Sequence, residues 1–168
     1  MNALTIDIRH AEPDDAPAIA DVHRASWQHA YSGILPHKTL RAMLERRNVA
    51  WWQRAIRGST SILVLDVGGI VAGYATLGLN RARSLPQEGE IYELYLLPEY
   101  QGVGLGRRLF TEVRRLLSSL GCKGTVVWCL EENGPGMGFY RGQDGRDVAE
   151  GTEHFDGRAV RKVAFVWP

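Results

Sequence analysis

Three glycines and a pair of arginines lie within eight residues of one another and could together bind a phosphate group. The segment runs from Gln101 to Arg108 and reads Gln-Gly-Val-Gly-Leu-Gly-Arg-Arg. Glycine lets the backbone approach a ligand closely and turn its N–H groups toward it. The segment opens an amphipathic helical stretch, so the partial positive charge of a helix N-terminus adds to the charges of the arginines. These features predict a pyrophosphate site.

The spacing of the glycines selects among the known phosphate-binding loops. The dinucleotide motif Gly-x-Gly-x-x-Gly is not met, because its third glycine would fall at Arg107. The P-loop lysine and its Ser/Thr are absent as well. The segment does match Gln/Arg-x-x-Gly-x-Gly/Ala through Gln101, Gly104 and Gly106. That pattern is the acyl-CoA signature of the GNAT family of N-acetyltransferases, which this chain resembles.

The elements around the loop follow from hydrophobic periodicity. Residues 90–97 read as a strand that ends at Pro98, and residues 105–120 carry apolar side chains at helical spacing, with Gly121 as the cap. Residues 125–130 read as the next strand. Strand, loop, helix and strand therefore form a crossover unit that presents the loop.

The remaining elements are predicted as antiparallel neighbours of this unit. Further strands are expected at residues 5–9, 61–67, 70–79, 146–154 and 158–166, with Gly68-Gly69 as a hairpin turn. Helices are expected after Pro13, over residues 38–47, and in a stretch that contains Trp51 and Trp52. We predict one domain over residues 1–168, a mixed α+β fold with a mainly antiparallel central sheet.

The resemblance covers nearly the whole chain. Residues 96–102 are similar to the family's passage from strand to loop, and residues 130–133 followed by Phe139-Tyr140 are similar to its second signature. Residues 27–36 resemble the region of the first two helices in small bacterial members. The resemblance implies an α/β/α sandwich with six to seven strands, about four helices, and strands four and five splayed apart.

The same resemblance implies acetyl-CoA as the cofactor and coenzyme A as the product. The pantetheine amides would pair with the backbone near Leu94 and Leu96, and a bulge in strand four would offer an N–H to the thioester carbonyl. Asn133 matches the asparagine that binds the cofactor arm. The pyrophosphate would rest on the backbone of the loop residues Gln101, Gly102, Val103, Gly104, Leu105, Gly106 and Arg107.

The implied reaction is direct attack by a primary amine in a ternary complex. An amine like that of lysine has a pKa of ~10.4, so a base must first remove a proton. Glu90 matches the base of the histone-modifying members by position, whereas Glu93 lies three residues nearer to the cofactor loop. Either residue is equally compatible with an ordinary charge at a strand edge. Tyr140 matches the general acid of the family, or is an aromatic residue packed under the sheet.

One segment departs from the family pattern. Gly134, Pro135, Gly136 and Gly138 stand where helix formers are usual, and each interior glycine costs ~1 kcal/mol relative to alanine. The family's Gly-Phe after this helix is missing too. We therefore expect a short or mobile helix before Tyr140.

The acceptor is predicted to be a small-molecule primary amine. Trp27 and Tyr31 share one helix face and form either core or an aromatic wall of the acceptor pocket. Trp51 and Trp52 cannot both face inward, and an exposed one would suit a homodimer interface. The alternatives are acetylation of a protein N-terminus or lysine, a non-catalytic module that binds and senses acyl-CoA, and a nucleotide-binding domain that uses the same loop.

Composition argues against several other classes. The formal charge of +1 gives no field for nucleic acid, and no apolar run approaches the ~20 residues of a membrane span. We see no signal peptide and expect a cytoplasmic protein. Two cysteines and five scattered histidines have no metal-ligand spacing, so no metal is predicted. Cys129, in an apolar strand, is interpreted as a buried structural thiol.

Overall fold

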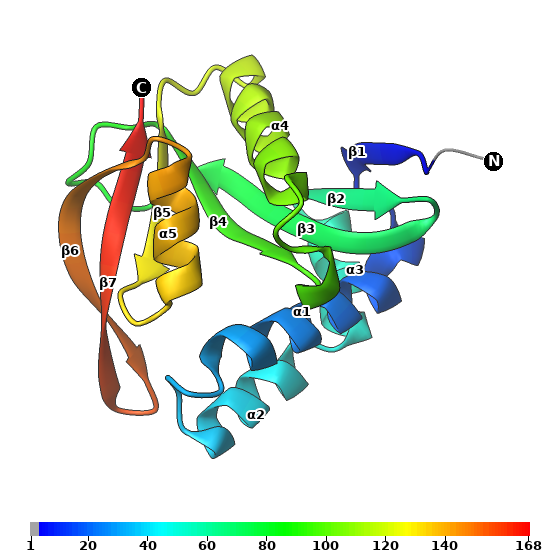
Figure 1. Cartoon of the computed structure of the whole chain (residues 1–168), viewed down its shortest axis with the longest axis horizontal. Helices are drawn as coiled ribbons and strands as arrows, with labels where there is room; N and C mark the ends of the chain where they lie inside the picture. The colour runs from blue at the N-terminus through cyan, green and yellow to red at the C-terminus, as the bar shows by residue number, and fades with distance from the viewer. Residues whose placement is uncertain (1–3) are drawn as a thin grey trace.

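The computed structural model describes residues 4–168 and, within them, places seven strands in one mixed sheet (Figure 1). The strands are β1 (Ile6–His10), β2 (Ser61–Val67), β3 (Ile70–Leu79), β4 (Gly89–Leu96), β5 (Thr125–Leu130), β6 (Arg146–Phe155) and β7 (Arg158–Trp167). They lie in the order β1-β2-β3-β4-β5-β7-β6. Every neighbouring pair is antiparallel except β4 and β5, which are parallel. The predicted mixed, mainly antiparallel sheet is confirmed.

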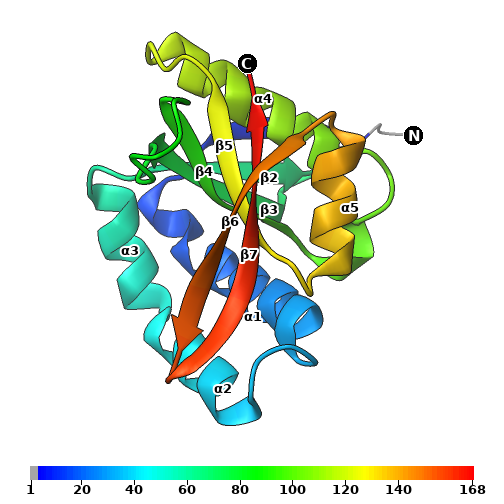
Figure 2. The ribbon, with the colours of Figure 1, turned by 90° about the vertical axis from the view of Figure 1, so that its left-hand side faces the viewer.

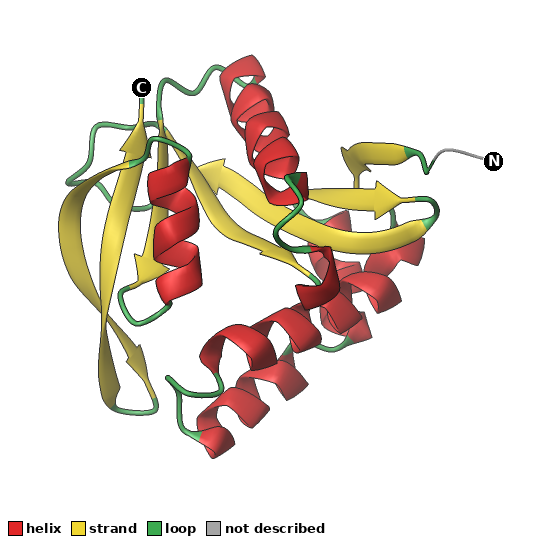
Figure 3. Cartoon of the chain, in the orientation of Figure 1, coloured by secondary structure: helices red, strands yellow, loops and turns green. Residues whose placement is uncertain are grey.

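Five α-helices of the described chain cover the two faces of this sheet (Figure 3). One face carries α1 (Ala16–Tyr31), α2 (His37–Arg46) and α3 (Val49–Arg57), and the other carries α4 (Leu105–Ser119) and α5 (Gly134–Gly142). Short 3-10 turns occupy Pro13–Asp15 and Pro98–Tyr100. The α/β/α sandwich is therefore confirmed, with five helices where about four were expected. None of the helices in residues 4–168 has the length and apolarity that crossing a bilayer requires.

Alternation along β2 explains how one strand serves both layers. Ile62 and Val64 pack with residues of α1 and α3, whereas Leu63 and Leu65 belong to the cluster that packs under α4. Helix α4 buries Leu105, Leu109, Phe110, Val113 and Leu117, which recur at the expected helical spacing. The amphipathic helix predicted from the sequence therefore covers the larger hydrophobic cluster, the one that contains Leu63 and Leu65.

Helices α2 and α3 follow each other as the two helices that the sequence predicts, and Asn48 marks the boundary between them. The side-chain oxygen of Asn48 accepts a hydrogen bond from the Trp51 N–H at 2.9 Å and caps α3. The break frees Arg47, whose guanidinium lies 4.1 Å above the Trp51 ring. Trp52 is fully buried, whereas Trp51 is half-buried and packs against the edge of the same core cluster.

The parallel contact between β4 and β5 is short. Residues 89–91 of β4 pair with residues 125–127 of β5, and the two strands then separate. On its other side, β4 stays paired with β3, where Thr76 opposes Glu93 but Leu77 opposes Ile91. This shift leaves Tyr92 as an extra, bulged residue. The predicted splay and bulge therefore begin at the same place.

Candidate active site

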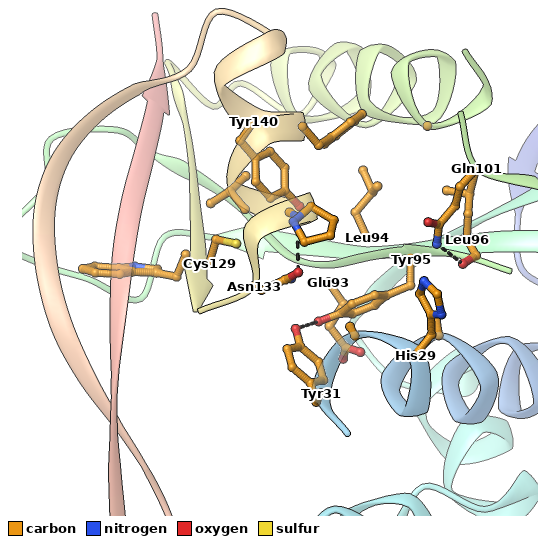
Figure 4. A pocket seen from close by; sticks show the side chains of 18 of the residues that line it. His29, Tyr31, Glu93, Leu94, Tyr95, Leu96, Gln101, Cys129, Asn133 and Tyr140 are labelled. Carbon is orange, nitrogen blue, oxygen red and sulfur yellow. Dashed lines mark hydrogen bonds between the residues drawn. The ribbon is translucent and has the colours of Figure 1, made fainter. Parts of the chain in front are cut away.

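A cavity of about 470 Å³ opens where β4 and β5 separate (Figure 4). Its walls come from the separated parts of both strands, the loop before α4, the end of α1, and α5. Eight of the ten predicted cofactor residues line it: Leu94, Leu96, Gln101, Gly102, Gly104, Gly106, Arg107 and Asn133. Residues from the loop signature and from the second signature, which includes Asn133, therefore line the same cleft.

Val103 and Leu105 do not line this cavity with their side chains. The Val103 side chain is 73% exposed, and Leu105 is buried in the core under α4. The loop turns its backbone, not these side chains, toward the cleft. Their predicted contribution is therefore restricted to the main chain.

The loop depends on glycine for two different reasons. Gly102 and Gly104 have φ values of 79° and 87°, in the left-handed region that side chains disfavour. Gly104 is the N-cap of α4, whose first N–H groups have no partner within the helix. Gly106 lies so close to α5 that a Cβ there would sit 3.3 Å from the Phe139 ring. The amide of Gln101 donates to the carbonyl of Leu96 at 3.1 Å and holds the loop to the end of β4 (Figure 4).

Helix α5 forms over nine residues in spite of its glycines. The side chain of Asn133 caps it by accepting a hydrogen bond from the Gly136 N–H at 3.2 Å, and Pro135 suits the first turn. A Cβ on Gly136 would lie 2.6 Å from the Asn133 amide nitrogen and 2.9 Å from the Cys129 sulfur. Gly136 therefore allows α5 to approach β5 closely, which the sequence pattern alone did not indicate.

Tyr140 is a core residue that also lines the first cavity. Its ring packs with Phe165 and Trp167 at centroid distances of 5.9 and 6.1 Å, so it is a core residue. It also lines the cavity, and its side chain points into it from α5 (Figure 4). Burial raises the pKa of this phenol well above its usual range. Tyr140 therefore keeps its proton at neutral pH.

A second cavity of about 690 Å³ adjoins the first. It lies between α1, α2 and the β6–β7 hairpin, and the predicted acceptor residues Trp27 and Tyr31 both line it. Five residues border both cavities and so mark their junction: Tyr31, Tyr92, Glu93, Tyr95 and Trp128. A group that reacts with a ligand in each cavity would have to act at this junction.

The two candidate carboxylates occupy different surroundings. Glu90 is 2% exposed and accepts hydrogen bonds from the backbone N–H and the guanidinium of Arg81, at 2.8–3.3 Å. It lines the second cavity but not the first. Glu93 accepts from Arg47 at 2.6 Å on one oxygen and from the Tyr74 hydroxyl at 2.7 Å on the other. Of the two, only Glu93 reaches the junction.

Tyr95 is a junction residue that the sequence did not single out, unlike its neighbour Tyr31. The hydroxyls of Tyr31 and Tyr95 are 2.5 Å apart and form a hydrogen bond in which either hydroxyl can donate (Figure 4). Burial raises the pKa of Tyr31 to about 12 and that of Tyr95 well above its usual range. Tyr95 lies two positions after Glu93 on β4, so the two-residue period of a strand places both side chains on one face and could have identified Tyr95. No pattern in the sequence connects Arg47 with this site.

Cys129 lines the first cavity and is otherwise enclosed. Burial raises the pKa of its thiol to about 12, with a smaller opposing effect from the positive charge of Arg141. The neutral thiol is a poor nucleophile, which favours the structural interpretation. Within residues 4–168, no group of three or more His, Cys, Asp or Glu side chains is placed to hold a metal ion.

Comparison with known proteins gives consistent matches over most of the chain. The model of the family described as "Acetyltransferase (GNAT) family" matches residues 18–144. The uncharacterized N-acetyltransferase YuaI of Bacillus subtilis is 31% identical over 164 residues, which cover 97% of this chain and 93% of the relative. The spermidine N(1)-acetyltransferase of Thermoplasma acidophilum is 22% identical over 139 residues, or 82% of this chain and 86% of the relative.

Solved structures match at the level of the fold. The crystal structure of the PaiA N-acetyltransferase from Thermoplasma acidophilum, in complex with coenzyme A, has a TM-score of 0.75 to this chain. The two are 22% identical, and the match covers 95% of this chain and 98% of the other.

The raised pKa of Cys129 predicts slow reaction with thiol reagents. At pH 8 a thiol with a pKa of about 12 is ionised in about one molecule in ten thousand, and the thiolate is the reactive form. We expect Ellman's reagent to titrate Cys122 in the folded protein and Cys129 after unfolding in guanidinium. The Cys122→Ala variant is the control, and fast release of the coloured thiolate from that variant would contradict the prediction.

Proposed function

This chain belongs to the GNAT family of acetyltransferases, and from that premise we propose that it moves the acetyl group of acetyl-CoA to a primary amine on a small molecule. One observation carries the proposal: Glu93 borders both a cleft that fits the cofactor and a second cavity that fits an amine. Membership of an acyltransferase family argues against the two other classes considered from the sequence, a non-catalytic sensor and a nucleotide-binding domain. We propose further that residues 1–168 act as one domain.

The residues around the first cavity fit acetyl-CoA. Gly102 and Gly104 form a bend without side chains at the start of α4, where backbone N–H groups and the guanidinium of Arg107 suit a pyrophosphate. Leu94 and Leu96 lie on the part of β4 that has left β5, so their backbone is available to an extended ligand. When bound, acetyl-CoA supplies the acetyl group as a thioester.

The second cavity favours a small acceptor over a protein segment. Phe155 and Val160 of the β6–β7 hairpin pack against residues of α1 and α2, and Figure 2 shows this hairpin reaching down to α2. Phe155 of the hairpin and Met43 of α2 both line the cavity, so the packed hairpin forms part of its wall. The volume of about 690 Å³ lies in the range typical of small-molecule sites. One relative is also named for spermidine, a small amine.

The proposed roles divide between the junction, where Glu93 lies, and the first cavity, where Tyr140 lies. Glu93 takes the proton of the acceptor ammonium, directly or through water, while Arg47 and Tyr74 hold its carboxylate in place. Tyr140 holds a proton at its hydroxyl oxygen inside the first cavity and donates it to the departing sulfur. The bulge at Tyr92 turns a backbone N–H out of the ladder, where it can polarise a carbonyl.

The cofactor loop is tested by Gly104→Glu. A bulky negative charge at this position blocks and repels the pyrophosphate, so we expect acetyl-CoA binding to fall below detection in isothermal titration calorimetry. Gly121→Glu is the matched control, because Gly121 also has a positive φ of 89° and open space around it but lies at the far end of α4. Wild-type affinity in Gly104→Glu would remove the loop from the binding site.

The two carboxylates are distinguished by a pair of isosteric variants. Glu93→Gln removes the proposed base and should lower kcat by about 10²-fold, the usual contribution of general base catalysis. Glu90→Gln should have an effect about tenfold smaller, because Glu90 does not reach the junction. Release of free thiol with saturating amine and acetyl-CoA measures both. A larger loss in Glu90→Gln would reverse the assignment.

Tyr140→Phe separates catalysis from packing. The variant keeps the buried ring and its aromatic contacts but removes the proton at the hydroxyl oxygen. We expect turnover to fall by about 10²-fold with little change in the affinity for acetyl-CoA. Unchanged turnover would leave Tyr140 with a structural role alone.

A further inference from the structure

The second cavity, which we call the acceptor cavity from here on, is lined by charges that cancel in pairs. Three ion pairs contribute to its lining: Arg47 with Glu93 at 2.6 Å, Arg81 with Glu90 at 2.8 Å, and Lys162 with Glu153 at 2.8 Å. Three cations and three carboxylates give these lining residues a formal charge of zero. Each carboxylate of the lining is therefore already neutralised by a cation of the chain itself.

Each of these three cations also lies over the face of an aromatic ring. The guanidinium of Arg81 lies 4.1 Å above the Tyr92 ring, and the ammonium of Lys162 lies 4.7 Å above the Trp128 ring. Arg47 is stacked on Trp51 in the same way, at 4.1 Å. Faces of Tyr92 and Trp128 that could bind a ligand's ammonium are thus covered by the protein's own cations.

The rest of the lining is aromatic and apolar. It consists of Trp27, Tyr31, Leu35, Met43, Tyr95 and Phe155, with Leu130 and Ala82 between them. Figure 4 shows Tyr31 and Tyr95 facing each other beside Glu93 at the junction. An aromatic or bulky apolar group would bury its surface here, because these walls offer it contact without unpaired charge.

Glu93 still has capacity for one ammonium group. A carboxylate offers about four acceptor positions, and Arg47 and Tyr74 occupy one on each oxygen. A second ammonium on the same ligand would reach Glu90 or Glu153 only beside Arg81 or Lys162, the cations that already pair with these carboxylates and would repel it. It would lose hydration without gaining a free carboxylate.

We infer that the acceptor carries a single amine on an aromatic or bulky apolar group, and that polyamines are rejected. The inference rests on the proposed function, since it assumes that the second cavity receives the amine. It adds the chemical class of that amine and assigns Lys162 and Arg81 as specificity residues. Both exclude further positive charge by occupying the carboxylates and rings that would otherwise bind it.

Binding tests the inference independently of turnover. Phenethylamine and spermidine are titrated calorimetrically into the chain saturated with coenzyme A, and the same amines are compared as acceptors by thiol release. We expect phenethylamine to bind about tenfold or more tightly than spermidine. Equal or tighter binding of spermidine, or no binding of phenethylamine, would overturn the inference.

A charge variant gives the sharper test. Lys162→Met leaves Glu153 without its cation and uncovers the Trp128 ring, so spermidine should bind about fivefold more tightly, with phenethylamine little changed. Arg161→Met is the matched control, because it removes one positive charge from the residue directly before Lys162, and Arg161 pairs with Glu131 and Glu150 outside the cavity. Retained affinity for coenzyme A shows that both variants are folded.

The outcomes separate the two proposals. An unchanged preference in Lys162→Met, or an equal shift in Arg161→Met, would contradict the specificity inference while leaving acetyl transfer intact. Selective binding of phenethylamine without thiol release would contradict acetyl transfer and still support the inferred class of ligand.

Discussion

β4 and β5 are hydrogen-bonded to each other over three residue pairs, and beyond them each strand keeps a partner on one side alone. A buried strand edge without partners is costly, because main-chain N–H and C=O groups need hydrogen bonds. The separation therefore needs support on both sides of the gap. The bulge at Tyr92 bends β4, and the close approach of α5, which Gly136 permits, covers β5. The first cavity follows from this divergence, and the loop before α4 closes its end.

The position of Glu93 depends on the same divergence. The residue lies directly after the bulge, so its side chain reaches the point where the two cavities meet. Its two oxygens are held by donors from two different elements, one by Arg47, at the break between α2 and α3, and the other by Tyr74 on β3. A carboxylate fixed in this way loses little further conformational entropy when a ligand binds. The break at Asn48, which looks like a minor detail of helix packing, is therefore what supplies the arginine.

The sequence was most informative where the signal is local. The glycine-rich loop and the amphipathic α4 are set by residues close to one another in the sequence, and both were predicted, whereas Asn133 was assigned to the cofactor arm and its capping of α5 was not foreseen. Contacts between distant residues were not predicted either. Arg47 and Glu93 are 46 positions apart, and Tyr31 and Tyr95 are 64 apart, so no pattern in the chain connects them. The choice between Glu90 and Glu93 depended on the register of β4, and the tolerance of glycine in α5 depended on how near β5 lies.

This division has a functional consequence. The cleft that fits the cofactor is built largely from residues 92–107 and 127–140, a crossover unit in which neighbouring segments position one another. The acceptor cavity instead joins α1, α2 and the β6–β7 hairpin, which meet only through tertiary packing. Substitutions in these outer elements can change the charge and shape of the second cavity while the loop and the splayed strands stay as they are. A local motif can therefore indicate the reaction, whereas the acceptor class that we propose depends on pairings such as that of Lys162 with Glu153, which only the folded chain brings together.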